Sequence, residues 1–138
     1  MTDPDPQLAP TGRSQLAIRW VSVGFALLFA LSAAVQLNDP DWGPWFAFYV
    51  AATAVAAVAP RWRHGQRTAS VALIVALLWC VGIAMLGVES ITIAELFHDL
   101  RMKTLNVERW REMGGLTITA AWMAVLTATL PRVGQPGR

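Results

Sequence analysis

Charged residues are scarce in this chain: only 14% of its 138 residues are Asp, Glu, Lys or Arg, whereas soluble domains average about 25%. The shortage is concentrated in long apolar stretches that hold no acidic residue. A stretch of about 20 apolar residues is long enough to cross the hydrocarbon core of a bilayer. Too few residues remain for a separate soluble domain. The composition therefore predicts an all-α membrane protein.

Cysteine is nearly absent as well. The single Cys80 excludes an internal disulfide and a multi-cysteine metal site, and its place in an apolar stretch indicates a small packing residue. The net charge of +2 comes from arginines at the ends of the apolar stretches, not from a basic patch with interleaved aromatic residues. We therefore expect no nucleic-acid partner, and the composition indicates no cofactor.

The apolar stretches predict a four-transmembrane-helix bundle over residues 16–131, flanked by a disordered cytoplasmic tail (1–15) and a short cytoplasmic tail (132–138). The spans are expected at residues 16–37, 45–59, 68–87 and 115–130. A cleaved signal peptide is the alternative interpretation of the first span, with small residues at 32–34 as its cleavage site. The first interpretation is favoured because the apolar stretch is long and a polar hairpin follows it directly.

The segment 88–113 differs from the spans because it mixes acidic and basic residues. Its apolar residues recur at i, i+3, i+4 and i+7, which predicts an amphipathic helix. These residues are Ile93, Leu96, Phe97 and Leu100. We expect this helix between spans 3 and 4, on the extra-cytoplasmic side of the membrane.

Lysine and arginine positions predict the orientation, since cytoplasmic loops are enriched in them. Seven arginines fall on one side, in the two tails, near the start of the first span and in the loop 61–67. On the other side, the first loop has no basic residue, and the segment 88–113 has four, offset by five acidic residues. Both termini should then be cytoplasmic, in a multi-pass protein of the plasma or inner membrane. Five of the seven tryptophans flank spans and are expected at the interface: Trp20, Trp42, Trp45, Trp62 and Trp110.

Small residues at i, i+4 spacing predict where the helices pack, because lipid provides no hydrophobic drive between helices and close backbone approach matters. In the first span this stripe is Ser22, Ala26, Ala30 and Ala34. Continued by one step it reaches Asn38, which is therefore expected to turn inward. Trp79 and Trp122, in the middle of their spans, are expected to pack.

The first candidate site is the polar hairpin after the first span, which contributes Gln36, Asn38, Asp39 and Asp41. Asn-Asp-Pro-Asp is typical of a turn, since Asn and Asp side chains bond nearby backbone N–H groups and Pro40 restricts the chain. Asp41 can also cap the second helix. The alternative is that the carboxylates bind a cation or a polar ligand.

The second candidate site lies before the fourth span and contributes Glu108, Arg111 and Glu112. On a helix these three side chains are neighbours, and Arg111 is expected to reach Asp39 or Asp41 of the hairpin. A solvated helix face is the alternative. Glu95, His98, Asp99 and Met102 form a weak metal pattern, because no second histidine or cysteine accompanies them, and we assign no metal ligand.

With both motifs in view, the chain resembles the transmembrane protein 220 family of small four-span membrane proteins. The resemblance covers about residues 18–130 and rests on two motifs: Gln36-Leu37-Asn38-Asp39-Pro40-Asp41, followed by Trp45 and Tyr49, and Arg111-Glu112 with Gly115-Leu116. The longer segment around 88–105 departs from the family pattern. The resemblance implies the fold and topology but no activity, since the family has no established one.

No nucleophile with a neighbouring base, no phosphate-binding glycine loop and no intramembrane charge is evident in the sequence. We therefore expect an integral membrane protein that is not an enzyme and acts as a binding, assembly or accessory protein through an extra-cytoplasmic polar cap. Besides lipid, its partner would be a membrane protein or a second copy of the chain. The alternative is a small membrane enzyme or transporter whose carboxylates bind a cation or polar ligand: Asp39, Asp41, Glu108 and Glu112.

Overall fold

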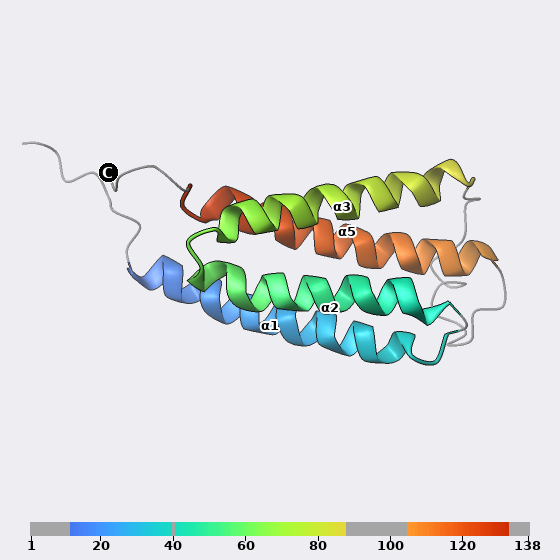
Figure 1. Ribbon diagram of the computed structural model, residues 1–138, viewed down its shortest axis with the longest axis horizontal. Coiled ribbons are helices and arrows are strands. Elements are labelled where there is room, and N and C mark those ends of the chain that lie inside the picture. The colour runs from blue at the N-terminus through green and yellow to red at the C-terminus, as the bar shows by residue number, and fades with distance from the viewer. Residues whose placement is uncertain (1–11, 40, 88–104, 133–138) are drawn as a thin grey trace, which may run out of the picture. The chain divides into compact units, whose positions relative to one another are not determined.

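The computed structural model describes residues 12–39, 41–87 and 105–132. All regular structure in these ranges is helical: α1 (Gly12–Gln36), α2 (Trp42–Val58), the 3₁₀ turn η1 (Ala59–Arg61), α3 (Gly65–Met85) and α5 (Leu105–Thr129) (Figure 1). The helices belong to two compact units. The first contains α1, α2, η1 and the start of α3, and the second, Arg67–Thr129, contains the rest of α3 and α5. The predicted all-α class is confirmed for the described residues.

Three stretches of the described chain are long and apolar enough to cross a membrane: Ser14–Gln36, Trp42–Arg61 and Gly65–Met85. Their large apolar side chains stay exposed, as at Leu31 on α1 (63%) and Leu78 on α3 (67%). In water, leaving this apolar surface exposed would lose a stabilisation of about 25 cal/mol per Å². In a bilayer there is no such loss, because lipid tails are as apolar as leucine. The exposed surface therefore suits helices surrounded by lipid.

The first unit is a helical hairpin in which α1 packs against α2 and η1. The buried residues on each helix follow the same i, i+4, i+7, i+11 spacing, which is one face of a helix. On α1 they are Ser22, Ala26, Phe29 and Ala33, and on α2 they are Trp45, Tyr49, Ala52 and Ala56. Most of these side chains are small, so the two backbones can approach closely.

The predicted packing stripe on α1 is wrong beyond Ala26. Ala30 and Ala34 are exposed, and so is Asn38, which does not turn inward. The reason is geometric: at 3.6 residues per turn, each step of four residues rotates about 40° past the starting face. Phe29 and Ala33 take the buried positions because a step of three residues restores the face.

The interface prediction for Trp45 is also wrong. Its side chain is 5% exposed, and its ring lies 6.5 Å from the ring of Tyr49. α2 begins at Trp42, three residues before the predicted start. Trp45 is thus one turn inside the helix and on its buried face. The exposed tryptophans Trp20, Trp42, Trp62 and Trp110 remain suited to a membrane interface.

The connection from α2 to α3 is tight. α2 ends at Val58, η1 continues through Pro60, and the amide of Gly65 donates to the carbonyl oxygen of Trp62 at 2.9 Å. A Cβ atom on Gly65 would lie 2.7 Å from the carbonyl carbon of Ala59 and closer still to its oxygen. Only glycine fits at this contact.

In the second unit, α3 and α5 run antiparallel, because two contacts join opposite ends of the helices. Near the start of α3, the Ser70 hydroxyl donates to the hydroxyl of Thr127 at 3.4 Å, close to the end of α5. At the end of α3, Arg109 Nη1 from the start of α5 donates to the carbonyl oxygen of Gly87 at 2.7 Å. Figure 1 shows the two helices side by side.

α5 corrects the predicted boundary between an amphipathic helix ending near residue 113 and a fourth span beginning at 115. One continuous helix runs from Leu105 to Thr129. The two glycines at 114 and 115 do not interrupt it, because flanking helix formers outweigh a cost of about 1 kcal/mol each. The predicted amphipathic residues Ile93 to Leu100 and the weak metal pattern lie outside the described residues.

Candidate functional site

The polar hairpin between α1 and α2 is built by the backbone. The amides of residues 37, 38 and 39 donate to the carbonyl oxygens three residues earlier, at 3.3, 3.3 and 2.9 Å, and the amide of Trp42 donates to Asp39 at 3.3 Å. Such i to i−3 bonds tighten the last turn of a helix and use carbonyl groups that have no helical partner. The turn is therefore closed without help from side chains.

The four predicted site residues of this hairpin have their side-chain polar atoms available. Asn38 and Asp41 are exposed, and Gln36 and Asp39 are half-buried. Asp41 occupies the N-cap position of α2, but its side chain makes no capping bond. Within the described residues none of the four makes a side-chain hydrogen bond or ion pair. The predicted side-chain-to-backbone bonds are absent there, so the turn does not require the chemistry of these side chains.

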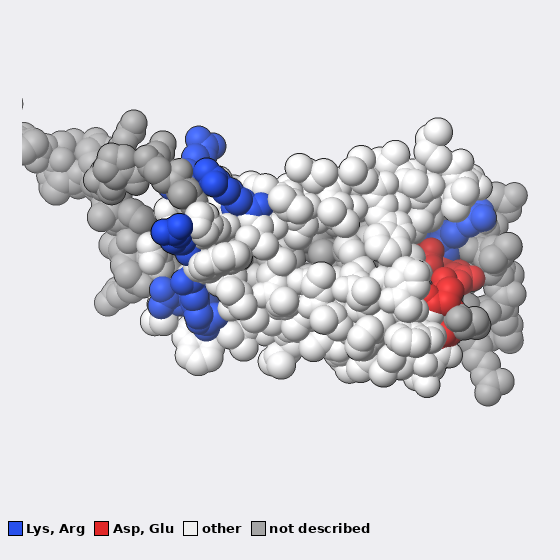
Figure 2. Space-filling model, viewed as in Figure 1, with Lys and Arg blue, Asp and Glu red and all other residues white. Residues whose placement is uncertain are grey.

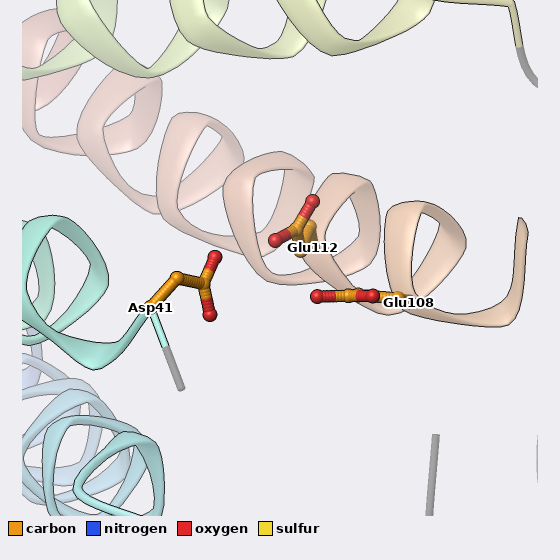
Figure 3. Close-up of side chains that lie close together, drawn as sticks. All are labelled: Asp41, Glu108 and Glu112. Carbon is orange, nitrogen blue, oxygen red and sulfur yellow. The ribbon is translucent and has the colours of Figure 1, made fainter. Parts of the chain in front are cut away.

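The second group of predicted residues lies on the first turns of α5. Glu108, Arg111 and Glu112 are all half-buried, and Figure 3 shows the carboxylates of Glu108 and Glu112 on the same side of the helix. Their oxygen atoms come within 4.8 Å of each other. Glu108 lies in the first turn of α5, where the helix dipole favours an acidic group and offsets part of its repulsion from Glu112.

This acidic pair alone does not define a metal centre. Calcium takes six to eight oxygen ligands, and magnesium demands a near-octahedral set, whereas the pair offers two carboxylates from one helix. Figure 3 also draws Asp41, which precedes α2 in the first unit. The predicted contact between the hairpin and Arg111 joins two separate units and stays a prediction.

Sequence reasoning missed the role of Arg109. Its Nη1 atom donates to the carbonyl oxygens of Leu86, at 3.3 Å, and Gly87, at 2.7 Å. These carbonyls follow the last turn of α3, where a cation is favoured by the helix dipole. Gly87 adopts φ +79°, the left-handed conformation that ends many helices. The glycine signals the helix end, but no local pattern links it to an arginine 22 residues later.

The arrangement of the described chain is that of an integral membrane protein, with long apolar helices whose charged side chains lie toward the helix ends. A family model described as "Transmembrane family 220, helix" matches residues 28–128. The chain belongs to this transmembrane family, which confirms the resemblance seen in its motifs. No solved structure matches the chain.

Proposed function

We propose that the protein is a four-span membrane protein that serves as a binding or accessory component through extra-cytoplasmic polar residues. The observation that carries the proposal is the hairpin between α1 and α2, two helices long and apolar enough to cross a membrane. Its side chains Gln36, Asn38, Asp39 and Asp41 make no hydrogen bond within the described residues. Polar groups that the fold does not use are available to a partner.

The bonding of its threonines supports α5 as the fourth span. The hydroxyls of Thr117, Thr119 and Thr129 donate to the carbonyl oxygens four residues earlier, at 2.7, 2.9 and 2.7 Å. Thr127 accepts from Ser70 on α3. Polar groups in lipid must be satisfied internally, and all four threonines in the apolar part of α5 meet this condition. They lower the hydropathy of the helix without barring it from a bilayer.

The arginines support the orientation. Arg61, Arg63 and Arg67 lie at the junction of α2 and α3, and Arg132 follows α5. The hairpin between α1 and α2 holds no basic residue. By the positive-inside rule the arginine-rich ends face the cytoplasm and the hairpin faces outward. This orientation makes the hairpin an extra-cytoplasmic contact surface.

Co-purification in mild detergent tests the proposed role. We expect the wild-type chain to retain a membrane protein partner or a second copy of itself. The combined variant Gln36→Ala, Asn38→Ala, Asp39→Ala and Asp41→Ala should lose it, because the polar contacts are removed while the backbone bonds of the turn remain. Insertion and thermal stability should change little, since these side chains bond nothing in the described chain.

The control replaces a polar residue beyond the hairpin, at the opposite end of α2: His64→Ala should leave the association intact. A wild-type chain that is strictly monomeric and retains no partner would overturn the proposal. Equal retention by the wild-type chain and the hairpin variant would exclude the hairpin as the contact surface.

A further inference from the structure

Exposed arginines gather at one end of the first unit. Arg19 lies on α1, Arg61 ends η1 and Arg63 follows it, and all three are exposed. Because α1 packs against η1, these residues share one end of the helical hairpin. We call Arg19, Arg61 and Arg63 the basic rim.

The lengths of the helices place the rim on a common level. α2 has 17 residues, about 25 Å at 1.5 Å per residue. The same length counted back from Gln36 along α1 reaches Trp20, next to Arg19. The turn of α1 that contains Arg19 and the 3₁₀ turn η1 therefore lie at the same depth along the hairpin axis.

Among the described residues of the first unit, no carboxylate lies near the rim. The only carboxylates among the described residues of the first unit are Asp39 and Asp41, which precede α2, whereas η1 follows it. Their separation from η1 by the length of α2 is about three Debye lengths at physiological salt. The nearest described anionic groups of the unit therefore screen the rim very little.

The guanidinium groups keep most of their donors. Arg61 Nη1 donates to the carbonyl oxygen of Ala57 at 2.7 Å, and Arg63 Nε donates to His64 Nε2 at 2.8 Å. Each guanidinium has five N–H donors, so each retains the paired donors that bind phosphate oxygens in a bidentate way. Arg19 makes no side-chain bond to the described residues.

Two exposed indole rings mark the depth of the rim in a bilayer. Trp20 is 69% exposed and Trp62 is 51% exposed, and each is the sequence neighbour of a rim arginine. Tryptophan is enriched at the level of the lipid headgroups. The rim arginines therefore lie where lipid phosphates lie, with charge opposite to that of an anionic headgroup.

We infer that the basic rim, Arg19, Arg61 and Arg63, binds the headgroup of an anionic phospholipid. This inference rests on the membrane insertion of α1 and α2 and is independent of the partner role proposed for the outer hairpin. Each arginine near an anionic surface contributes about a fivefold gain in affinity. Three together give a preference of roughly two orders of magnitude over a zwitterionic lipid.

Native mass spectrometry of the full chain, released from micelles, tests the inference by titration with phosphatidylglycerol and phosphatidylcholine of identical acyl chains. We expect the wild-type chain to retain phosphatidylglycerol preferentially. The variant Arg19→Gln, Arg61→Gln, Arg63→Gln should lose this preference. The matched variant with three Arg→Lys changes should keep part of it, because the charge stays and only the bidentate geometry is lost.

The single variant Arg63→Gln tests the inference even if the triple variant fails to insert. It should insert normally, because Arg63 bonds only its neighbour His64 in the described chain. It should lower the phosphatidylglycerol affinity about fivefold. Equal binding of the two lipids by the wild-type chain, or an undiminished preference in Arg63→Gln, would overturn the inference. Displacement of the lipid by millimolar inorganic phosphate would also overturn it, since the site would then select free phosphate.

Discussion

Gly65 lies against the backbone of Ala59. Its Cα faces the carbonyl group of Ala59, and an added Cβ would lie 2.7 Å from the carbonyl carbon. Backbone atoms cannot move aside as the end of a flexible side chain can. We therefore expect Gly65→Ala to destabilise the first unit by about 1–3 kcal/mol, the range for forced overpacking. Thermal unfolding in detergent, followed by helical circular dichroism, measures the change.

Gly24→Ala is the matched control for that substitution. A Cβ at Gly24, in the interior of α1, would meet no atom within 4 Å. Alanine is favoured over glycine in a helix by roughly 0.5–1 kcal/mol, so this variant should be unchanged or more stable. Equal stability of the two variants would show that the contact at Gly65 relaxes without cost.

Ser22 is a second residue at which a small change should alter the packing of α1. It is fully buried on the packed face of α1, and its hydroxyl has no hydrogen-bond partner. A buried hydroxyl without a partner destabilises, so we expect Ser22→Ala to be neutral or stabilising by up to about 1 kcal/mol. Ser22→Leu should destabilise by about 1–3 kcal/mol through overpacking. The same thermal unfolding experiment separates the effect of packing from that of polarity. A lower thermal stability of Ser22→Ala would mean that the hydroxyl is hydrogen-bonded.

At the scale of the helix, the end of α3 depends on α5. Arg109 donates to the carbonyls of Leu86 and Gly87, which no longer have helical partners. We expect Arg109→Gln to loosen the last turn of α3, since both the hydrogen bonds and the favourable charge are lost. Hydrogen exchange of residues 83–87 should accelerate about fivefold, corresponding to roughly 1 kcal/mol for a solvent-exposed interaction of this kind.

Arg109→Lys is the control for charge. It keeps a cation near the carboxyl end of α3 and should restore part of the protection. Exchange in residues 52–56 of α2 should stay the same in both variants, because α2 makes no bond to Arg109. Unchanged exchange at the end of α3 in Arg109→Gln would contradict the capping role.

The elements were predictable to the extent that one local pattern determines them. Apolar length placed three spans within a few residues of α1, α2 and α3, and Asn38-Asp39-Pro40-Asp41 identified the turn. The buried faces were less predictable, because a fixed i, i+4 stripe drifts off the face of a helix, and Trp45 lay inside α2. The α5 boundary failed because charge at residues 108–112 does not stop a helix. Arg109 and Gly65 depend on contacts that no local pattern records.

At the scale of the whole chain, charge and apolar surface are separated along the helices. On the visible face, charged side chains lie toward the helix ends, and the length between is uncharged (Figure 2). Three described stretches meet the length and composition of a span. α5 falls outside that set because its threonines and its charged first turns lower its hydropathy. Its crossing of the membrane therefore decides whether the two termini share a side.

Reporter fusions test this crossing through the parity of the spans. Three spans would place the two termini on opposite sides, and four would place both in the cytoplasm. We expect green fluorescent protein fused after Arg138 to fluoresce, and alkaline phosphatase fused at the same point to be inactive. Fused after Gly87, where α3 has ended, phosphatase should be active, since an odd number of spans then precedes it. An active phosphatase after Arg138 would show that α5 does not cross the membrane, because an odd number of spans would then precede the fusion point. The bonded threonines of α5 would in that case belong to a helix outside the bilayer.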